Sequence, residues 1–358
     1  MNADTKIGID ELFLGGRVGP CRVESLRGHG QFGLVFAGVN EETGAPVAIK
    51  FLNPSRLQSV HLNDFEGEGR MLERLESCDG VVTLHDRGNF ILPSELTGSP
   101  FEIVVPYQTM ALAEGPLSDL CETPEARAQL SDLQRLQLWR SAALSMMRMH
   151  GQMVANRDVK AENCLLFFDK NGDYIVRFGD FGRGKDLSLI QSRPDDAYFQ
   201  GRGDPFHAAP EAVYLQAGAD APDFVAADYY GLGSLLVELL TGQSMTRLSV
   251  TDVRGARDQA MYDLERGQVR DLAVLTTKHE LVVESVANVL PKSVREDARV
   301  LLGTLCDPVP SRRLVRGPFG RDKNDIQPLT WVLRRIDIMI RRIKIDNRTA
   351  RRLHGRTR

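Results

Sequence analysis

Several features that would define a class of protein are scarce or missing in this chain of 358 residues. Its five cysteines are scattered without a C-x-x-C pair, which argues against a disulfide framework or a zinc site. The first residues lack a basic start followed by an apolar run, so no signal peptide is predicted. Because no run of about 18 apolar residues occurs, no transmembrane segment is predicted either. We therefore expect a reduced, cytoplasmic protein.

The charge balance and the apolar content are ordinary for a globular protein. A formal net charge of -3 gives no general reason to expect binding to nucleic acid or to a membrane. With 42% hydrophobic and 26% charged residues, the chain can bury a sizeable core, which argues against global disorder. Its length suits either one large domain of two lobes or two separate domains.

The most informative stretch is VANRDVKAENCLL at 154–166, which is followed by FGDFG at 178–182. It brings Asp158, Lys160 and Asn163 close together in the chain, and Asp180 comes shortly afterwards. Such a set suits phosphoryl transfer from Mg-ATP, in which one group accepts a hydroxyl proton, one neutralises the moving phosphate and two oxygens hold Mg²⁺. The apolar segments on either side of these polar residues predict short strands, which would hold the active loops rigidly.

A glycine cluster, Gly28-x-Gly30-x-x-Gly33, lies between two segments of alternating polarity. The segment after it, LVFAGV, is rich in β-branched and aromatic residues, which predicts strand, tight turn and strand. The same glycine spacing occurs in dinucleotide-binding sites, but there it must open a helix. Glycines suit this turn because backbone N–H groups approach phosphates only where no Cβ intrudes. An ordinary glycine-rich hairpin is the alternative for this motif taken alone.

A lysine, Lys50, ends the apolar strand VAIK. The segment DFEGEGRMLERL that follows has apolar residues at helical spacing, and Glu68 falls on the same stripe. We therefore expect Glu68 to be the partner of Lys50, with Glu66 as the alternative. Two glycines flank Glu68, and each weakens a helix by about 1 kcal/mol relative to alanine. The helix could consequently be mobile there.

Taken together, these motifs resemble those of the protein kinase superfamily. NRDVKAEN and DFG are similar to its catalytic loop, H-R-D-x-K-x-x-N, and to its metal-binding D-F-G. GDPFHAAPE at 203–211 resembles the G-T-P-x-Y-x-A-P-E that ends a kinase activation segment, and DYYGLGSLLVELLTG at 228–242 resembles the central buried helix. The late D-P-x-x-R motif implies that Arg312 or Arg313 pairs with Glu211. The parts follow in kinase order from about residue 20 to 316, as in eukaryotic-like (Hanks-type) serine/threonine kinases, and the compact chain resembles the bacterial ones.

The resemblance implies that Lys50, Glu68, Asp158 and Lys160 are catalytic residues and that two further residues bind the metal. Asp158 would be the catalytic base, and Lys160 would steady the γ-phosphate. Asn163 and Asp180 would hold Mg²⁺ or Mn²⁺. A Lys160 two residues after the base also favours the serine/threonine branch over the tyrosine kinases.

The same resemblance implies an ATP site between two lobes. Lys50 would reach the α- and β-phosphates while Glu68 holds it in place. Residues 106–108 would form the hinge. The other residues expected to contact ATP are the glycines that cover it and the residues that surround its adenine: Gly28, Gly30, Gly33, Val35, Ala48, Val105, Tyr107 and Leu165.

Three departures from the family pattern bear on function, and the one that matters least is the spacing from Asp307 to Arg312, one residue longer than usual. Asn156 replaces the histidine that precedes the Arg-Asp pair, a position expected to affect packing more than chemistry. Asp204 replaces the threonine that bridges the catalytic base and lysine in serine/threonine kinases. A carboxylate at 204 would pair with Lys160, repel Asp158, or imitate a permanent negative charge.

The residue before the catalytic base, Arg157, is typical of kinases whose activation loop is ordered by a phosphate paired with that arginine. Between Arg183 and Phe206, the hydroxyls available for such phosphorylation are Ser188, Ser192 and Tyr198. Transfer from a second copy of the chain would require self-association.

The predicted architecture is an α+β, bilobal protein kinase fold. A polar leader would occupy 1–19, a small lobe of five antiparallel strands and one helix 20–106, and a larger, mainly helical lobe 107–316. Residues 317–358 would form a basic extension with an amphipathic helix, because apolar residues recur at helical spacing from 329 to 343 beside pairs of arginines. This helix would either close the large lobe or contact an anionic partner: a membrane surface, a nucleic acid or an acidic protein.

The function predicted from the sequence is an ATP-dependent serine/threonine protein kinase that acts on a protein substrate and on itself. A pseudokinase that serves as a nucleotide-binding scaffold is the alternative, although every residue needed for the chemistry is present. A kinase of small molecules is disfavoured by the GDPFHAAPE segment.

Overall fold

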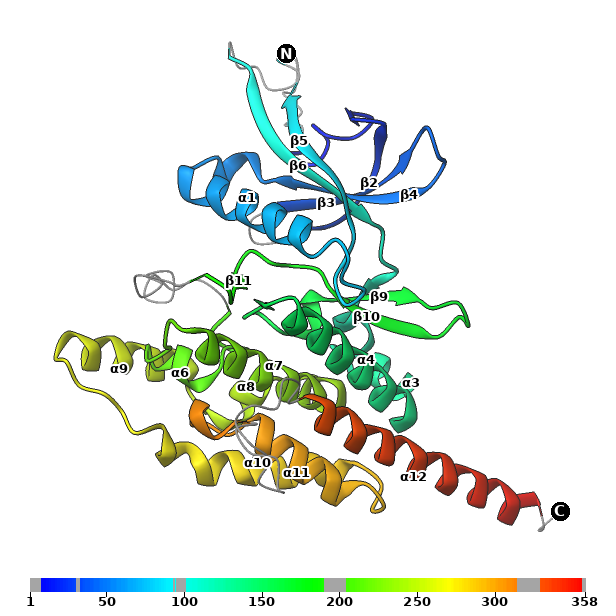
Figure 1. The fold of residues 1–358 in the computed structure, drawn as a ribbon, viewed down its shortest axis with the longest axis vertical. Coiled ribbons are helices and arrows are strands. Elements are labelled where there is room, and N and C mark those ends of the chain that lie inside the picture. The colour runs from blue at the N-terminus through cyan, green and yellow to red at the C-terminus, as the bar shows by residue number, and fades with distance from the viewer. Residues whose placement is uncertain are drawn as a thin grey trace, which may run out of the picture. The chain divides into compact units, whose positions relative to one another are not determined.

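The computed structural model describes residues 8–29, 33–92, 94, 101–189, 204–313 and 329–355. The chain divides into two compact units, as a bilobal fold requires (Figure 1). Unit one comprises residues 1–114 with 181–183, and unit two comprises 115–180 with 184–358. The small lobe was predicted to end at residue 106, so this boundary lies eight residues later than expected.

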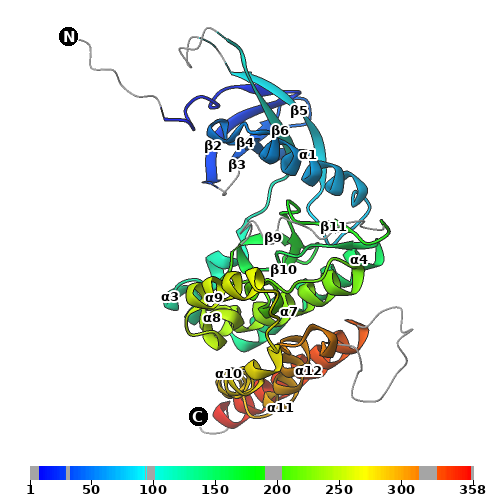
Figure 2. The same ribbon diagram turned by 90° about the vertical axis from the view of Figure 1, so that its left-hand side faces the viewer.

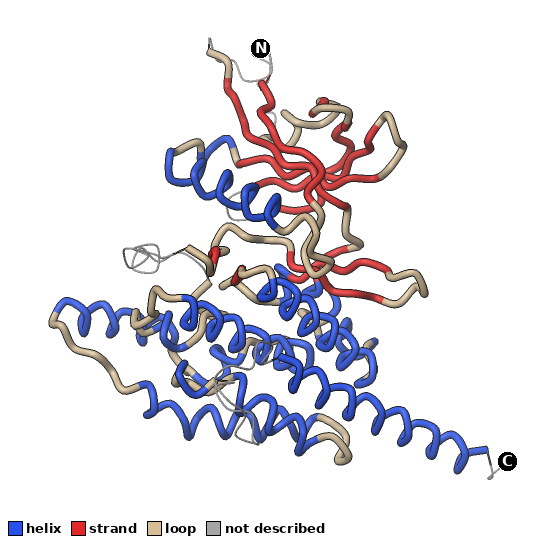
Figure 3. Tube along the Cα trace, viewed as in Figure 1, coloured by secondary structure: helices blue, strands red, loops and turns tan. Residues whose placement is uncertain are grey.

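Unit one is built on a six-stranded antiparallel sheet with the strand order β1-β2-β3-β4-β6-β5 (Figure 3, red). Its long helix, α1 (Ser59–Arg74), packs against β5 and β6. The strands β2 to β6 correspond to the five that the sequence predicts, and β1 is an addition. Their bounds are β1 (Arg17–Val18), β2 (Cys21–His29), β3 (Gly33–Asn40), β4 (Pro46–Leu52), β5 (Leu84–Leu92) and β6 (Ile103–Ala111).

The N-terminal segment is folded from residue 8 onwards, so the predicted leader over 1–19 is wrong for residues 8–19. Phe13 is completely buried and its ring centroid lies 4.3 Å from that of Phe51. The backbone N–H of Val23 donates to the carbonyl of Gly16 at 2.9 Å, and β1 pairs with β2. Phe13 thus anchors this segment in the core of unit one, although its polar composition had led us to predict an unpacked leader.

Unit two begins with small strand pairs that support the predicted catalytic stretch. A three-stranded sheet has the order β10-β9-β7, and a second pair joins β8 to β11. The two apolar segments predicted as strands are β9 and β10, joined by a turn at 169–173. The bounds are β7 (Gly115–Pro116), β8 (Val154–Ala155), β9 (Cys164–Phe168), β10 (Tyr174–Phe178) and β11 (Lys185–Asp186).

The rest of unit two is helical, and two long helices form its centre. Ser131 caps α4 (Asp132–Gly151) through a capping box with Gln134. Helix α7 (Ala221–Thr241) ends at Gly242 in the left-handed conformation, φ 73°. Within the described residues, α7 is the one helix long and apolar enough to cross a membrane, and 83% of its apolar window is buried inside the protein. Its hydrophobicity therefore matches its place in the core.

The other helices of unit two lie around this pair, and α10, α11 and α12 lie together on one side of the unit (Figure 2). The α-helices are α3 (Pro124–Gln129), α6 (Pro210–Val213), α8 (Met245–Ser249), α9 (Val253–Glu265), α10 (Thr276–Val289), α11 (Arg295–Leu305) and α12 (Leu329–Gly355). Single 3-10 turns occur at Pro54–Arg56, Leu117–Leu120, Ala161–Asn163, Leu272–Leu275 and Pro310–Arg312.

The predicted amphipathic helix of the basic extension is α12, and it packs on unit two against α4 and α11. Its apolar stripe is buried, as Ile336, Met339 and Ile343 illustrate. Arg140 of α4 forms an ion pair with Asp337 of α12 at 2.6 Å. The helix therefore closes the helical unit with its apolar face, while most of its arginines face solvent.

Candidate active site

The Lys50 side chain of unit one donates to both carboxylate oxygens of Glu68 at 2.7 Å. The pair is shielded from solvent, since the side chains are 14% and 4% exposed. The alternative partner, Glu66, instead faces solvent and contacts Arg70 at 3.5 Å. The structure therefore selects Glu68, as its position on the helical stripe predicts.

A glycine brings α1 close enough to the sheet for this pair to form. A Cβ at Gly69 would lie 3.2 Å from Arg87 and 3.2 Å from Gln108, tighter than ordinary contacts. In the same region, Gln108 donates from Nε2 to the carbonyl of Phe65 at 2.8 Å. The glycine that weakens the helix by propensity thus permits the close contact of helix and sheet that positions Glu68.

Two glycines of the predicted phosphate-binding turn lie in described strands, and the third, Gly30, lies outside the described residues. A Cβ at Gly33 would come within 2.8 Å of the Phe51 carbonyl oxygen and 3.3 Å of the Lys50 side chain. Gly28 has open space where a Cβ would project. Gly33 is therefore needed for the fit against Lys50, whereas no atom of the described residues beyond its chain neighbours lies within 4 Å of a Cβ at Gly28.

The strand register corrects the predicted adenine pocket. Directly paired residues share a face of the sheet, and Tyr107 pairs with Phe51 while Ala48 pairs with Met110. Tyr107 and Val105 therefore point to the face opposite Lys50, where both join the buried aromatic core. They cannot line a pocket on the face of Lys50, and assigning them to that pocket was wrong.

Tyr107 has a clear role in the core of unit one instead. Its hydroxyl donates to Asp86 Oδ2 at 3.1 Å. Burial, together with the neighbouring Asp86 carboxylate, raises the pKa of Tyr107 to about 12. Residues 106–108 lie inside β6 and pair with both neighbouring strands, so the predicted hinge is also wrong, and the chain leaves unit one after Glu114.

The face of the sheet that carries Lys50 holds two of the predicted adenine contacts. Val35 pairs directly with Lys50, and Ala48 lies two residues before Lys50 on the same strand. Met110 shares this face through its pairing with Ala48, and sequence reasoning missed it. Met110 can be identified only from the register of β6 against β4, because the sequence does not show which apolar residues of β6 face the same side as Lys50. Leu165, the remaining predicted contact, belongs to unit two and packs against Gly179.

The catalytic stretch of unit two forms a tight loop around Asp158. Asn163 donates from Nδ2 to the Asp158 carbonyl at 2.8 Å and to its carboxylate Oδ2 at 2.9 Å. The Lys160 ammonium lies 3.9 Å from Asp158 Oδ2 and 3.1 Å from Glu162. Although burial opposes the charged form of Lys160, these carboxylates raise its pKa. Two predicted catalytic residues, Asp158 and Lys160, and the predicted metal ligand Asn163 therefore lie together.

Two hydrogen bonds hold Asp180 and the residue before it against this loop. Asn156, which is fully buried, donates from Nδ2 to the Asp180 carbonyl at 2.7 Å and accepts from the Asp158 N–H at 3.1 Å. The N–H of Gly179 donates to the Asn163 carbonyl at 3.1 Å. The asparagine that replaces the family's histidine thus links the predicted catalytic base, Asp158, to the second predicted metal ligand, Asp180.

Buried Asp228 of α7 holds the start of the catalytic loop. Its carboxylate accepts the backbone N–H groups of Asn156 at 2.9 Å and Arg157 at 2.6 Å, and it also contacts His150 at 2.8 Å. Arg157 has a left-handed backbone with φ 66°, a conformation that the two bonds to Asp228 stabilise. Its guanidinium stacks over the Phe224 ring at 4.4 Å.

The end of the predicted activation segment contains a charge cluster that sequence reasoning missed. Asp204 accepts hydrogen bonds from the Phe206 N–H at 2.9 Å and contacts His207 Nδ1 at 2.6 Å. On the other side of the ring, His207 Nε2 lies 3.7 Å from Glu238 of α7. Asp204 was expected to pair with Lys160, to repel Asp158 or to imitate a permanent negative charge. Its hydrogen-bonded side-chain partner is His207, three residues further along the same turn, and Lys160 acts on it electrostatically by lowering its pKa.

The pKa shifts in this cluster follow its geometry. Burial opposes charge on His207, but the hydrogen bond to Asp204 and the nearby Glu238 raise its pKa above the ordinary value. Burial also opposes charge on Asp204, yet its bonds to His207 and Phe206 lower its pKa. Burial raises the pKa of Glu238. These shifts favour a protonated His207 beside an ionised Asp204, whereas buried Glu238 ionises less readily than an exposed glutamate.

We predict that His207→Gln removes a pH-dependent contribution to stability. Because its pKa is raised on folding, protonated His207 stabilises the native state fully below the unfolded value near 6.5. This contribution disappears as the pH rises through the raised native pKa. Urea unfolding of both proteins from pH 5.5 to 9 should therefore give a difference in unfolding free energy that shrinks with rising pH. A difference that is constant with pH would contradict the imidazolium assignment.

A buried ion pair joins the end of the activation segment to the last part of the kinase-like region. Arg313 donates to the two carboxylate oxygens of Glu211 at 2.8 and 2.7 Å, and its side chain is completely buried. Further donor atoms reach the carbonyls of Asp307 and Ala226. The sequence left Arg312 and Arg313 as alternatives, and the structure selects Arg313.

The predicted phosphorylation sites are described only in part. Ser188 donates from Oγ to Asp186 at 2.6 Å, next to β11. Ser192 and Tyr198 lie outside the described residues.

The ligand atoms available in unit two suit a Mg²⁺ ion that also binds water and phosphate better than a metal ion held by protein ligands alone. Among the described residues, no group of three or more His, Cys, Asp or Glu side chains could hold a metal. Asn163 commits its amide nitrogen to Asp158, which leaves its oxygen as the ligand atom, and Asp180 adds a carboxylate. One or two protein oxygens completed by water and phosphate are typical of Mg²⁺ sites.

Unit one thus holds a shielded lysine–glutamate pair beside Gly33, and unit two holds a loop that fixes Asp158 and Asn163. The protein kinase domain family matches residues 22–316, which is most of the chain. The chain belongs to the protein kinase family.

Several curated relatives are serine/threonine kinases by name. A probable serine/threonine-protein kinase of Dictyostelium discoideum is 29% identical over 232 residues, which are 63% of this chain and 40% of that protein. Serine/threonine-protein kinase 10 of Mus musculus is 30% identical over 220 residues, 59% of this chain and 20% of the relative. The chain thus spans well under half the length of these relatives, and the similarity concerns their kinase part.

Proposed function

We propose that the protein is an ATP-dependent serine/threonine kinase that transfers the γ-phosphate of Mg-ATP to hydroxyl groups of proteins, including its own. The observation that carries this proposal is the orientation of Asp158, whose carboxylate is held by Asn163 at 2.9 Å. A fixed carboxylate of this kind can accept the proton of an incoming hydroxyl, and positioned proton acceptance typically contributes a factor of 10² to 10⁴ in rate.

The other residues supply positioning and charge. Lys50, fixed by Glu68, would bind the α- and β-phosphates, and the glycine-rich segment predicted from Gly28 to Gly33 would lie over them. Val35, Ala48 and Met110 share the face of Lys50 and would contribute to the adenine site. Lys160 would neutralise the transferred group. Magnesium, held through Asn163 and Asp180, would supply electrostatic stabilisation of the phosphate oxygens.

Two observations support serine or threonine as the acceptor. Lys160 occupies the position two residues after the base that is typical of the serine/threonine branch. The curated relatives quoted above carry that specificity in their names. A cytoplasmic location fits the five buried cysteines, none of which is in a disulfide.

The test is transfer of ³²P from ATP with Mg²⁺ to the protein itself and to a generic basic protein. The full chain is compared with Asp158→Ala, and Asp173→Ala serves as the matched control because it removes an exposed carboxylate from the same unit. We expect transfer by the wild type and the control and none by Asp158→Ala, with label on serine or threonine. Nucleotide binding without transfer in the wild type would instead favour a pseudokinase, and label on tyrosine would refute the proposed specificity.

A further inference from the structure

Helix α12 carries a second stripe on the side opposite its buried face. We call it the basic stripe, and it consists of Arg334, Ile338, Arg341, Ile345, Arg348 and Arg352, all of them exposed. The successive spacings of four and three residues put these side chains on one line along the helix. The stripe is about 27 Å long, and arginine alternates with isoleucine along most of it.

The positive charges of the basic stripe are not neutralised by acidic side chains in the described part of the protein. None of its four arginines has an ion pair there, whereas two arginines at the flank of the helix, Arg335 and Arg342, both contact Asp297 of α11. Between residues 341 and 352, six basic residues stand against the single acidic Asp346, which accepts a hydrogen bond from Ser293. The stripe therefore presents uncompensated positive charge to solvent.

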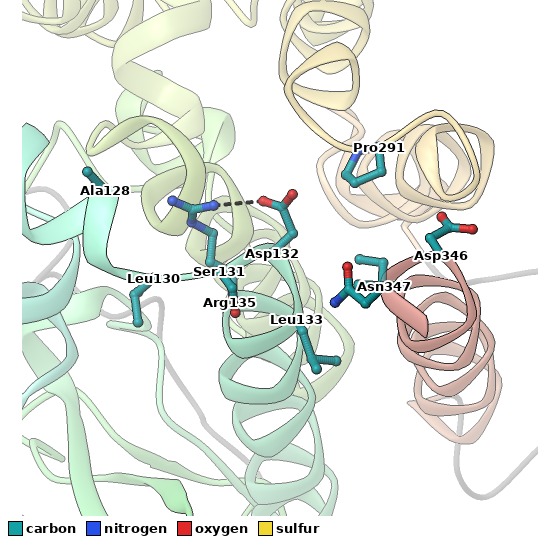
Figure 4. A pocket seen from close by; sticks show the side chains of 10 residues that line it. Ala128, Leu130, Ser131, Asp132, Leu133, Arg135, Pro291, Asp346 and Asn347 are labelled. Atoms are coloured by element: carbon teal, nitrogen blue, oxygen red, sulfur yellow. Dashed lines mark hydrogen bonds and ion pairs between the residues drawn. The ribbon is translucent and has the colours of Figure 1, made fainter. Parts of the chain in front are cut away.

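The second half of α12 also extends away from the helices that support the first half (Figure 1). A hollow of about 400 Å³ opens where α12 separates from the start of α4, between Asp132 and Leu133 on one side and Asp346 and Asn347 on the other (Figure 4). From Lys344 to Arg352 every residue is exposed. Helices this short are marginal in water without packing, so a contact along this segment would stabilise it.

The two isoleucines help to identify the partner. Ile338 is 43% exposed and Ile345 is 60% exposed, and each lies between two arginines of the stripe. A helix that packs on α12 would receive these side chains between its own apolar residues at the same three–four spacing. Its acidic residues would then face the arginines, which gives charge complementarity along the whole contact.

We propose that the basic stripe of α12 is a docking surface for an acidic amphipathic helix of a partner protein, about nineteen residues long. The inference concerns binding and is independent of the proposed catalytic function.

Two other anionic partners fit the observations less well. A membrane would require a continuous apolar face to insert, and the apolar face of α12 is already buried on unit two. A nucleic acid would contact the arginines but would leave both isoleucines without a partner. The formal net charge of -3 also supplies none of the overall attraction that long polyanions usually exploit.

The probe is a synthetic helical peptide with leucines at three–four spacing flanked by glutamates, compared with a scrambled peptide of the same composition. Binding to the full chain is measured by fluorescence anisotropy for the wild type, Arg348→Glu, Ile345→Ser and Arg351→Glu. The last variant is the matched control, since it makes the same charge change three residues away, off the stripe. Circular dichroism checks that each variant is folded.

We expect the patterned peptide to bind the wild type and Arg351→Glu similarly, and both stripe variants to lose about tenfold in affinity, about 1.4 kcal/mol. Equal binding of the scrambled peptide, or equal losses at positions 348 and 351, would overturn the proposal in favour of unspecific charge attraction. Stripe-dependent binding of phosphatidylserine vesicles or of poly(U) RNA that exceeds peptide binding would also overturn it. So would self-association through the stripe in sedimentation experiments.

Discussion

Replacing Lys50 by methionine should lower phosphoryl transfer by at least about 10²-fold, the effect of removing one group that stabilises transition-state charge. The methionine side chain keeps the apolar stem but lacks the ammonium that binds both oxygens of Glu68. Because Glu68 would then be buried without its cation, the second variant is Lys50→Met with Glu68→Gln, which removes the unpaired charge. We expect the double variant to recover stability without recovering activity.

The matched control for this experiment is Glu66→Gln, which neutralises the exposed glutamate two residues before Glu68. Among the described residues, its ion-pair partner is Arg70 on the same helix, at 3.5 Å. We expect its transfer rate to equal that of the wild type, measured with the same ³²P assay and checked by thermal unfolding. Wild-type activity in the Lys50 variants would refute the assignment of the site.

Replacing Arg313 by methionine should destabilise unit two by about 3–5 kcal/mol, the usual effect of breaking a buried ion pair. The guanidinium is fully buried and the change would leave the Glu211 carboxylate without its partner. It would also remove donors from the carbonyls of Asp307 and Ala226. Urea unfolding of the full chain, followed by circular dichroism, measures the loss.

Arg312→Met is the control for this prediction because Arg312 is the exposed neighbour of Arg313. Exposed substitutions of this kind usually change stability by no more than about 0.5 kcal/mol. The double variant Glu211→Gln with Arg313→Met should recover part of the loss, since it leaves no buried charge. Equal stability of the two single variants would show that the buried pair is energetically unimportant.

The sequence predicted the parts of the site that depend on spacing along one element. Glu68 was found because it lies on the inward stripe of a helix, and Asp158 and Asn163 because they share one short loop. The adenine contacts Val105 and Tyr107 were wrong because they depend on the register between strands. A shift of one residue in a strand reverses the face of every side chain, and no local pattern in an apolar strand fixes that register.

Other features could not be derived because they depend on contacts between distant segments. Phe13 anchors the first residues through the aromatic core, although their own composition is polar. Arg312 and Arg313 are equivalent in the sequence, and only the path of the chain after Pro310 buries one of them. His207 could have been noticed, since a residue three after Asp204 in a turn is a natural hydrogen-bond partner.

The presence of an asparagine at position 156 has a consequence for how the catalytic loop responds to acid. Its amide has no proton to gain or lose between acidic and alkaline solution, so the link from Asp158 to the Asp180 carbonyl keeps the same donor and acceptor throughout. An imidazole in that place would change its charge near neutrality. The hydrogen-bonded link between Asp158 and Asp180 is thus indifferent to pH, and the response that we expect from this region near neutrality comes from His207.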